Sequence, residues 1–176
     1  MGLRPGRCYR KKKNKPYTRV SQRKPRKSYI KGVPGNKIKQ FETGDKKRDF
    51  EIELKLIVED NLRIRHNAIE SSRVNANKYL VGALGEKNYF LKVLVYPHDV
   101  LRENPLATGA GADRLQEGMR KSFGNPIGTA ARVDKGQAFM VVRAPEGKLA
   151  EAKEALRLAK HKLPCKCRIQ GLEDYI

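Results

Sequence analysis

The sequence predicts an α+β fold, with two helices packed on a mainly antiparallel sheet and an extended basic arm before them. Three observations lead to this prediction. Charge is distributed very unevenly, apolar residues alternate with polar ones in short segments, and they recur at helical spacing in two longer segments. We therefore expect an arm over residues 1–36 and a globular core over residues 37–176, with a Gly-rich loop region at 98–128.

The arm is defined by its charge. The 176-residue chain has 39 Lys and Arg against 19 Asp and Glu, which gives a net charge of +20. The first forty residues hold fifteen of the basic residues and no acidic one, so residues 41–176 carry only +5. Such a block repels itself and needs a polyanion to become compact, and phosphate backbones are the commonest partner of this kind.

The arm also contains regularly spaced prolines and tyrosines. Each proline disfavours helix at its own position and at the residue before it, which favours an extended chain. The prolines are Pro5, Pro16, Pro25 and Pro34, and the tyrosines are Tyr9, Tyr17 and Tyr29. Two interpretations of the tyrosines remain open, because their rings can stack on RNA bases or pack onto the core.

Two strands are expected at the start of the core. Residues 37–41 fit a short strand, and residues 43–47 fit a polar loop. Residues 50–58 alternate, which is typical of a half-buried strand. The apolar face of that strand would consist of Phe50, Ile52, Leu54, Leu56 and Val58.

A helix and a central strand should follow. Asn67 with Glu70 fits a capping box at the helix start, and Gly85 is placed to end the helix. Its apolar stripe would be Ile69, Ala76, Leu80, Ala83 and Leu84. Residues 88–96 are apolar on both faces, which indicates a strand covered on both sides.

The second half begins with the Gly-rich region, in which residues 115–121 could form a helical turn. Residues 129–133 and 137–143 then fit a hairpin that turns at Asp134–Gly136. Residues 148–162 have the periodicity of an amphipathic helix ended by Pro164, and residues 165–176 could add a final strand.

No catalytic constellation accompanies these elements, so neither an enzyme nor a cofactor is expected. The chain contains no phosphate-binding loop of the G-x-x-x-x-G-K-[ST] type and no H-E-x-x-H motif. Cys8, Cys165 and Cys167 are interpreted as unconnected thiols, because a zinc site usually needs four ligands in two close pairs. The absence of a secretory signal and of any long apolar stretch predicts a cytosolic protein without a membrane partner.

The Gly-rich region has cations of its own, which leaves two interpretations. Glycines allow close approach of a backbone to phosphate, and Arg forks match phosphate oxygens, so the region could form a second RNA-facing surface. The alternative is an ordinary mobile loop, and the basic arm favours the RNA-facing surface, since phosphate contacts usually spread over a large surface. The cations concerned are Arg114, Arg120, Lys121 and Arg132.

Several exact motifs make the sequence resemble a known family. MGLRPGRCYR at residues 1–10, KNKPY at 13–17 and AGADRLQ at 110–116 are the most specific, and shorter matches extend from GVP at 32–34 to ARV at 131–133. Together they resemble the large-subunit ribosomal proteins of the archaeal and eukaryotic L ten e family, whose bacterial relatives are called L sixteen. The short C-terminal end favours an archaeal source.

The resemblance implies an α/β-hammerhead-like α+β fold and a structural place in the large ribosomal subunit. The implied partners are large-subunit ribosomal RNA, the acceptor end of tRNA near the peptidyl transferase centre, and neighbouring ribosomal proteins, with no homo-oligomer expected. A loop matching residues 101–114 would face tRNA. Its candidate residues are Arg102, Asn104, Thr108, Gly109 and Gly111.

The candidate ribosomal RNA contacts combine the charge argument with the resemblance. They are Arg4, Arg7, Arg10, Lys11, Lys12, Lys13, Lys15, Tyr17, Arg19, Arg23, Lys24, Arg26, Lys27, Lys31, Arg114, Arg120, Lys121 and Arg132. A generic DNA- or RNA-compacting protein would share this charge, but it would not need the interleaved tyrosines. An RNA-modifying enzyme would also need a cofactor loop or an acid–base pair.

Overall fold

The computed structural model describes residues 3–12, 18, 30–104, 111, 118–120 and 122–171. Within these ranges the chain forms one 3-10 helix, two α-helices and eight strands. In chain order they are η1 (Gly6–Cys8), β1 (Glu42–Gly44), β2 (Ile52–Val58), β3 (Leu62–Arg65), α1 (His66–Leu84), β4 (Phe90–Val93), β5 (Asp99–Glu103), β6 (Asn125–Val133), β7 (Ala138–Ala144), α3 (Leu149–Lys160) and β8 (Cys167–Gly171).

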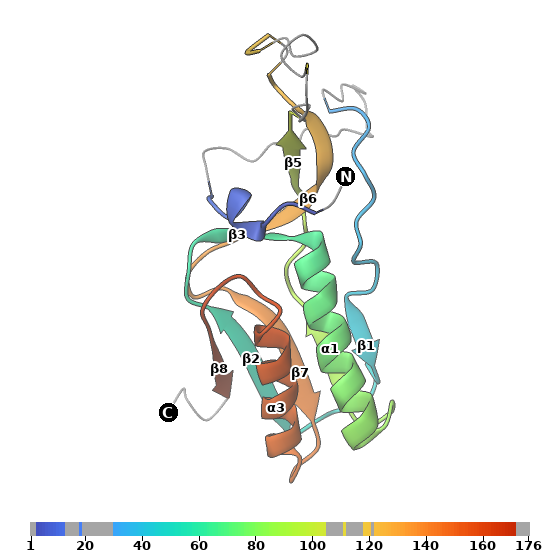
Figure 1. Ribbon diagram of the computed structural model, residues 1–176. Coiled ribbons are helices and arrows are strands. Elements are labelled where there is room, and N and C mark those ends of the chain that lie inside the picture. The colour runs from blue at the N-terminus through green and yellow to red at the C-terminus, as the bar shows by residue number, and fades with distance from the viewer. Residues whose placement is uncertain are drawn as a thin grey trace.

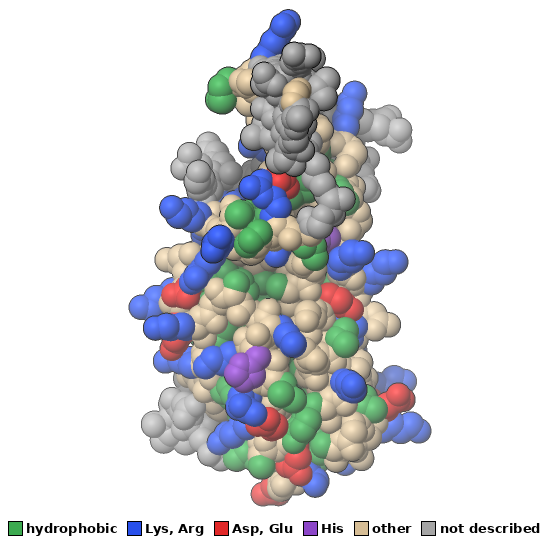
Figure 2. All heavy atoms as spheres, viewed as in Figure 1, with side chains coloured by type: hydrophobic (Ala, Val, Ile, Leu, Met, Phe, Trp, Pro, Cys, Tyr) green, Lys and Arg blue, Asp and Glu red, His purple; other side chains and the backbone are tan. Residues whose placement is uncertain are grey.

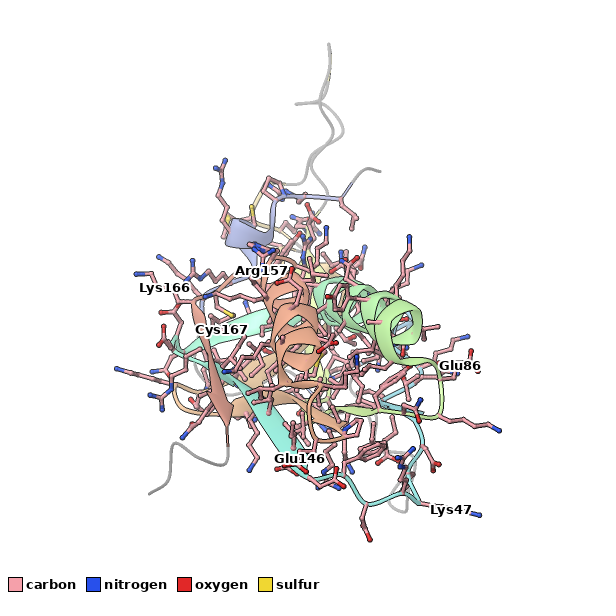
Figure 3. All side chains as sticks on the ribbon, turned by 90° about the horizontal axis from the view of Figure 1, so that it is seen from below. Lys47, Glu86, Glu146, Arg157, Lys166 and Cys167 are labelled. Carbon is pink, nitrogen blue, oxygen red and sulfur yellow. The ribbon has the colours of Figure 1, made fainter. Side chains whose placement is uncertain are left out.

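The larger sheet has five strands in the order β1-β4-β7-β2-β8, and every neighbouring pair is antiparallel. Helices α1 and α3 lie side by side on one face of this sheet (Figures 1 and 3). The arrangement confirms the predicted α+β class with two helices on an antiparallel sheet.

The main core fills the space between these helices and the five-stranded sheet. Leu54 and Leu56 of β2 are at most 2% exposed, as alternation in this strand predicted. They pack in one cluster with Ile69 and Leu80 of α1 and Leu156 of α3. At 25 cal/mol per Å² of apolar area, burial of each such side chain contributes about 2 kcal/mol.

A second sheet of three antiparallel strands, in the order β3-β6-β5, lies beyond the N-terminal end of α1 (Figure 1). Leu62 and Ile64 of β3 and Val133 of β6 join the main core cluster, so the two sheets share apolar packing. The expectation of one sheet is therefore wrong. The sequence signal for β3 is a short Leu-Arg-Ile-Arg alternation directly before α1.

The predicted hairpin between residues 129–133 and 137–143 does not form. The turn itself exists, because the Gln137 N–H donates to the Asp134 carbonyl at 3.1 Å. However, β6 pairs with β3 and β5, whereas β7 pairs with β2 and β4. The end of β2 takes the place of the partner strand, since Val58 exchanges hydrogen bonds with Gly136 and Gln137. The turn thus carries the chain from one sheet to the other.

The region expected to be irregular, residues 98–128, contains regular structure at both ends. Strand β5 and the first half of β6 lie inside it and pair with each other. The predicted helical turn at 115–121 falls mainly outside the described residues, although residues 118–120 do form a turn.

Helix α1 begins earlier than its sequence suggested. Its N-cap is Arg65, without a side-chain cap hydrogen bond, so the predicted capping box is wrong. Glu70 instead accepts two hydrogen bonds from Arg73, at 2.7 and 3.0 Å, because a guanidinium offers a carboxylate a stronger bidentate contact than one backbone N–H. Of the predicted stripe, only Ala83 is exposed.

The strands predicted at 37–41 and 88–96 are shifted or shortened. Residues 37–41 precede β1 rather than form it, although the Phe41 carbonyl accepts from Val93 N–H at 2.8 Å. Strand β4 ends at Val93. Beyond it, Leu94 and Tyr96 are 43% and 49% exposed, so this segment is not covered on both sides.

The C-terminal elements agree best with their predictions. Helix α3 covers most of the predicted 148–162 segment, and β8 forms within 165–176 and pairs with β2. In the part of the chain that the structure describes, no helix is both long and apolar enough to span a bilayer.

Candidate nucleic-acid interface

The beginning of the basic arm is docked on the three-stranded sheet. The backbone N–H of Arg63 in β3 donates to the Arg10 carbonyl at 2.9 Å, and its Nε donates to the Tyr9 carbonyl at 3.1 Å. Two residues further along β3, the guanidinium of Arg65 donates to the Arg4 carbonyl at 2.9 Å. Since β3 is an edge strand, residues 4–10 satisfy donors that would otherwise face solvent. Within the docked segment the chain departs from the extended form at Gly6–Cys8, which form the 3-10 helix η1.

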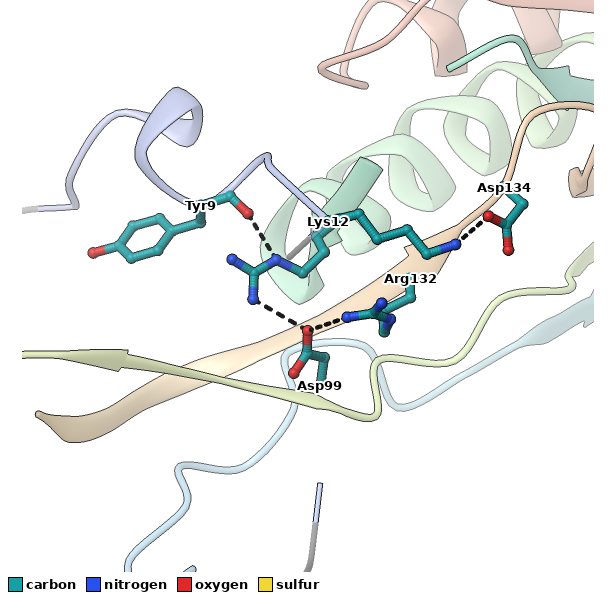
Figure 4. Close-up of polar contacts among 6 residues, drawn as sticks. Tyr9, Lys12, Asp99, Arg132 and Asp134 are labelled. Carbon is teal, nitrogen blue, oxygen red and sulfur yellow. Dashed lines mark hydrogen bonds and ion pairs between the residues drawn. The ribbon is translucent and has the colours of Figure 1, made fainter. Parts of the chain in front are cut away.

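A buried carboxylate lies beneath this docked segment. Asp99 of β5 is 1% exposed and accepts from Arg63 at 3.1 Å, while Arg132 of β6 approaches the same oxygen at 3.6 Å (Figure 4). Two guanidinium groups share one carboxylate, so this cluster keeps one positive charge in excess. The buried acid orients both arginines, and Arg63 then holds the arm through Tyr9 (Figure 4).

Tyr9 attaches the arm by its side chain as well. Its ring is 8% exposed and packs against Leu101 and Ala130, and its hydroxyl donates to Glu103 at 2.8 Å. Arg4 donates to the other Glu103 oxygen at 2.6 Å. Burial raises the pKa of Tyr9, whereas the hydrogen bonds from Tyr9 and then Arg4 lower the pKa of Glu103. For Tyr9, packing onto the core is therefore the interpretation that the structure supports.

Several predicted RNA contacts are engaged within the protein. Arg4 pairs with Glu103, Arg10 pairs with Asp60 at 3.0 Å, and Lys12 pairs with Asp134 (Figure 4). Side chains remain largely exposed at Arg7, Lys11, Lys31 and Arg120. Figure 2 shows Lys and Arg side chains projecting around the whole outline of the molecule, with fewer Asp and Glu side chains.

The structure brings together only part of the predicted sites. Arg4, Arg7, Arg10, Lys11, Lys12 and Arg132 lie in or beside the docked segment. The predicted residues that fall outside the described part of the chain are Lys13, Lys15, Tyr17, Arg19, Arg23, Lys24, Arg26, Lys27, Thr108, Gly109, Arg114 and Lys121. In the loop region, Arg102 stacks on Phe123 with its guanidinium carbon 3.8 Å from the ring centroid and donates to the Phe123 carbonyl at 2.9 Å.

Sequence reasoning missed the residues that receive the arm. Arg63 and Arg65 alternate with Leu62 and Ile64, and this short period-two pattern was the available signal for an edge strand with two outward cations. Nothing local marks Asp99 as a buried partner, because its arginines come from positions 36 and 33 residues away in the sequence.

The cysteines do not form a metal centre in the described residues, where no group of three or more potential ligands occurs. All three cysteines are free thiols, and Cys165 and Cys167 are in contact, with 3.5 Å between their sulfur atoms. Their mutual hydrogen bond lowers the pKa of Cys165 and, with burial, raises that of Cys167.

An α+β domain with a strongly basic segment fixed to its side is the class of protein that works in contact with a polyanion. Residues 13–170 match the family described as Ribosomal protein L16p/L10e. The chain is 52% identical to the large ribosomal subunit protein uL16 of Staphylothermus marinus, covering 96% of this chain and 93% of that protein. It is 50% identical to the protein of that name from Thermofilum pendens, covering 96% of each. The chain therefore belongs to the L16p/L10e family of ribosomal proteins.

Membership of this family confirms three further expectations. The protein is a structural component of the ribosome rather than an enzyme, its place is the cytoplasmic ribosome, and its relatives are archaeal, as with the protein of Methanococcus aeolicus at 47% identity over 96% of this chain and 94% of its own length. The resemblance drawn from the short motifs is thereby confirmed.

Proposed function

We propose that this protein is a structural constituent of the large ribosomal subunit that binds large-subunit ribosomal RNA through its basic arm and through cations of the three-stranded sheet. The observation that carries the proposal is the docking of residues 4–10 on β3. It fixes the origin of the arm on the same surface as Arg63, Arg65 and Arg132. The start of the arm and the cations of the sheet therefore lie next to each other.

The ion pairs at the start of the arm fit this function. Carboxylates at Glu103, Asp60 and Asp134 hold Arg4, Arg10 and Lys12 close to the body of the protein. Such exposed pairs contribute only up to about 1 kcal/mol each, so phosphates can compete with them at small cost. Phosphate contacts, which release counterions, would then supply most of the affinity.

The second half of the proposal concerns tRNA. We assign the loop of residues 101–114 to the acceptor end of tRNA near the aminoacyl site, where it would help to position the substrate while the ribosomal RNA performs the chemistry. Support comes from the motif at 110–116 and from β5, which carries the start of the loop and is held by its pairing with β6. Neighbouring ribosomal proteins complete the set of partners, and the protein acts as a single copy.

Salt-dependent binding of protein-free large-subunit RNA tests the proposed binding of ribosomal RNA through the arm. The double variant Arg7→Gln, Lys11→Gln removes two exposed arm cations, and Lys47→Gln, Lys87→Gln removes two exposed cations near the lower end of the body. The logarithm of the binding constant decreases with the logarithm of the salt concentration, and the magnitude of this slope should be smaller by about 2 in the arm variant. Each lost phosphate contact reduces that magnitude by about 0.9. Equal slopes in the two double variants would contradict arm binding.

Site-directed photocrosslinking tests the second half. A benzophenone amino acid at Asn104 should crosslink to the acceptor strand when aminoacyl-tRNA is bound to subunits, whereas the same group at Lys47 should not. A probe at Asn104 that labels only ribosomal RNA would show that the loop does not face tRNA.

A further inference from the structure

Three neighbouring aromatic rings, referred to as the stack, lie in a row on the surface where the two sheets meet. Tyr96 is the middle ring: it stacks on Phe41 at 5.2 Å between centroids, and it contacts His98 at 4.4 Å with the two rings tilted by 43°. Residues 94–98 connect β4 of the larger sheet to β5 of the smaller one. Tyr96 is 49% exposed and His98 is also exposed, so the outer end of the stack faces solvent.

The exposure of these rings follows from strand geometry. Val95, Pro97 and Asp99 point into the protein, so the alternate residues Leu94, Tyr96 and His98 point outward. Exposed aromatic area costs free energy that burial would recover. A stacked row of rings held at the surface is therefore a feature that packing of this chain alone does not explain.

Hydrogen bonds fix the stack in place. The Asn36 side chain donates to the Tyr96 hydroxyl at 3.3 Å, and its amide oxygen accepts from Thr129 of β6. The Phe41 carbonyl accepts from Val93 N–H at 2.8 Å, and His98 N–H donates to the Tyr96 carbonyl at 3.1 Å. Both contributing segments are thus anchored to the sheets, and little conformational freedom would be lost on binding.

Exposed lysines occur beside the rings in the sequence, at Lys37 and Lys39. The adjoining carboxylates are engaged elsewhere, since Glu42 pairs with Lys46 and Lys92 and the buried Asp99 pairs with Arg63. A flat aromatic surface beside cations suits an unpaired base with its phosphate, because the ring accepts the base and the ammonium groups accept the charge. An acidic or apolar protein segment would use the cations or the rings, but not both at once.

We infer that the Phe41–Tyr96–His98 stack binds an unstacked base of ribosomal RNA, on the outer face of His98, with Lys37 and Lys39 contacting the adjoining phosphates. The inference rests on the proposed function, and it names a second type of RNA contact that acts through stacking rather than charge. Because every base offers a π face, the site selects a single-stranded nucleotide without selecting its identity.

Binding of protein-free large-subunit RNA by three variants tests the inference. Tyr96→Ala removes the ring that supports His98, so it should weaken binding by at least about fivefold, the lower limit for loss of one stacked base. Its salt slope should stay at the wild-type value, since no charge is removed. Tyr96→Phe should retain most of the affinity. Leu94→Ala is the matched control, because Leu94 points to the same side of the same segment and is 43% exposed.

A fluorescent variant tests the same site without removing a ring. The chain has no Trp, so His98→Trp provides a single indole at the outer end of the stack. Addition of the RNA should quench its emission, and a Trp at Leu94 should be quenched much less. Equal quenching at the two positions would overturn the placement of the base.

The outcomes separate this inference from the proposed function. If the wild-type protein does not bind the RNA, the proposed function is wrong. If it binds and Tyr96→Ala binds equally well with an intact thermal transition, only the stacking inference is overturned. Equal RNA binding combined with poor incorporation into subunits would assign this face to a neighbouring protein instead, which also overturns the inference.

Discussion

Tyr9 and Glu103 lie 94 positions apart in the sequence, and a hydrogen bond of 2.8 Å joins the tyrosine hydroxyl to the carboxylate. This contact places the start of the basic arm against β5, next to the loop assigned to tRNA. The start of the arm and the start of the loop therefore share β5 as a structural support. A change in the position of one is expected to alter the position of the other.

Replacement of Tyr9 should release the start of the arm. Tyr9→Ala removes a ring that is 8% exposed and packs on Leu101 and Ala130, so the free energy of unfolding should fall by about 3 kcal/mol. Tyr9→Phe keeps the ring and loses only the hydroxyl contact, so its effect should be clearly smaller. Urea unfolding measures both values. A Tyr9→Ala variant as stable as the wild type would mean that residues 3–12 contribute nothing to folding.

The buried carboxylate of Asp99 should contribute more to stability than any exposed core acid that pairs with an arm cation. Asp99→Asn removes the carboxylate that Arg63 and Arg132 share, at a position that is 1% exposed, which should cost about 3–5 kcal/mol. Asp134→Asn is the control, since Asp134 is 67% exposed and pairs only with Lys12 in the described contacts, and it should cost about 0–1 kcal/mol. Chemical denaturation of the two variants distinguishes these values, and similar losses would argue against a structural role for Asp99.

The parts of the fold that sequence predicted well are those whose signal is local. Alternation in β2 and helical spacing in α3 depend on neighbouring residues, and both elements form where expected. The hairpin predicted after Gly128 does not form. Its turn depends on neighbouring residues and is present, but its two strands pair with strands that are distant in the sequence. Strand β6 exchanges the expected partner β7 for β3 and β5, and no local pattern records that choice.

The candidate site divides in the same way. The excess of Lys and Arg in the arm is apparent from the sequence composition, and it predicted that the protein binds a polyanion. The function of Tyr9 could not be read from the sequence, because its environment of Leu101, Glu103 and Ala130 is assembled from distant strands. Likewise, the stack of Phe41 on Tyr96 joins residues from two separate predicted strands, of which the one at 88–96 was expected to be covered on both sides.

Acidification should destabilise the protein through His66. Its Nδ1 accepts the backbone N–H of Lys37 at 3.0 Å, so the contact needs the neutral imidazole. Burial lowers the pKa of His66, and the charges of Lys37 and Arg65 lower it further. The unfolded chain therefore binds the proton more readily than the folded one. Stability from this residue is complete above the unfolded pKa of about 6.5 and is lost as the pH falls from there through the lower folded pKa.

Thermal unfolding between pH 8 and pH 5 measures this effect. His66→Asn is the informative variant, since Asn retains a side-chain acceptor but does not titrate in that range. The wild-type melting temperature should fall more steeply with decreasing pH than that of the variant. Parallel curves would show that His66 is not the group responsible.

Replacement by alanine should reduce stability to very different extents at two glycines that both have a positive φ. Gly44 in β1 has φ +93°, and a Cβ at this position would lie 2.1 Å from the Tyr89 carbonyl oxygen. That oxygen also accepts the Asp45 N–H at 3.0 Å, so the backbone cannot move away without loss of a hydrogen bond. Gly32 has φ +67° and no atom within 4 Å of a built Cβ.

Gly32→Ala should therefore cost only the backbone strain of about 1–2 kcal/mol, whereas Gly44→Ala adds a steric clash and should exceed about 3 kcal/mol. Denaturant midpoints of the two variants provide the comparison. Since β1 is the edge strand beside β4, hydrogen exchange should show the loss of protection in Gly44→Ala concentrated at residues 42–44 and 90–92, which pair with each other. Uniform loss over both sheets would indicate instead that β1 unfolds only together with the whole domain.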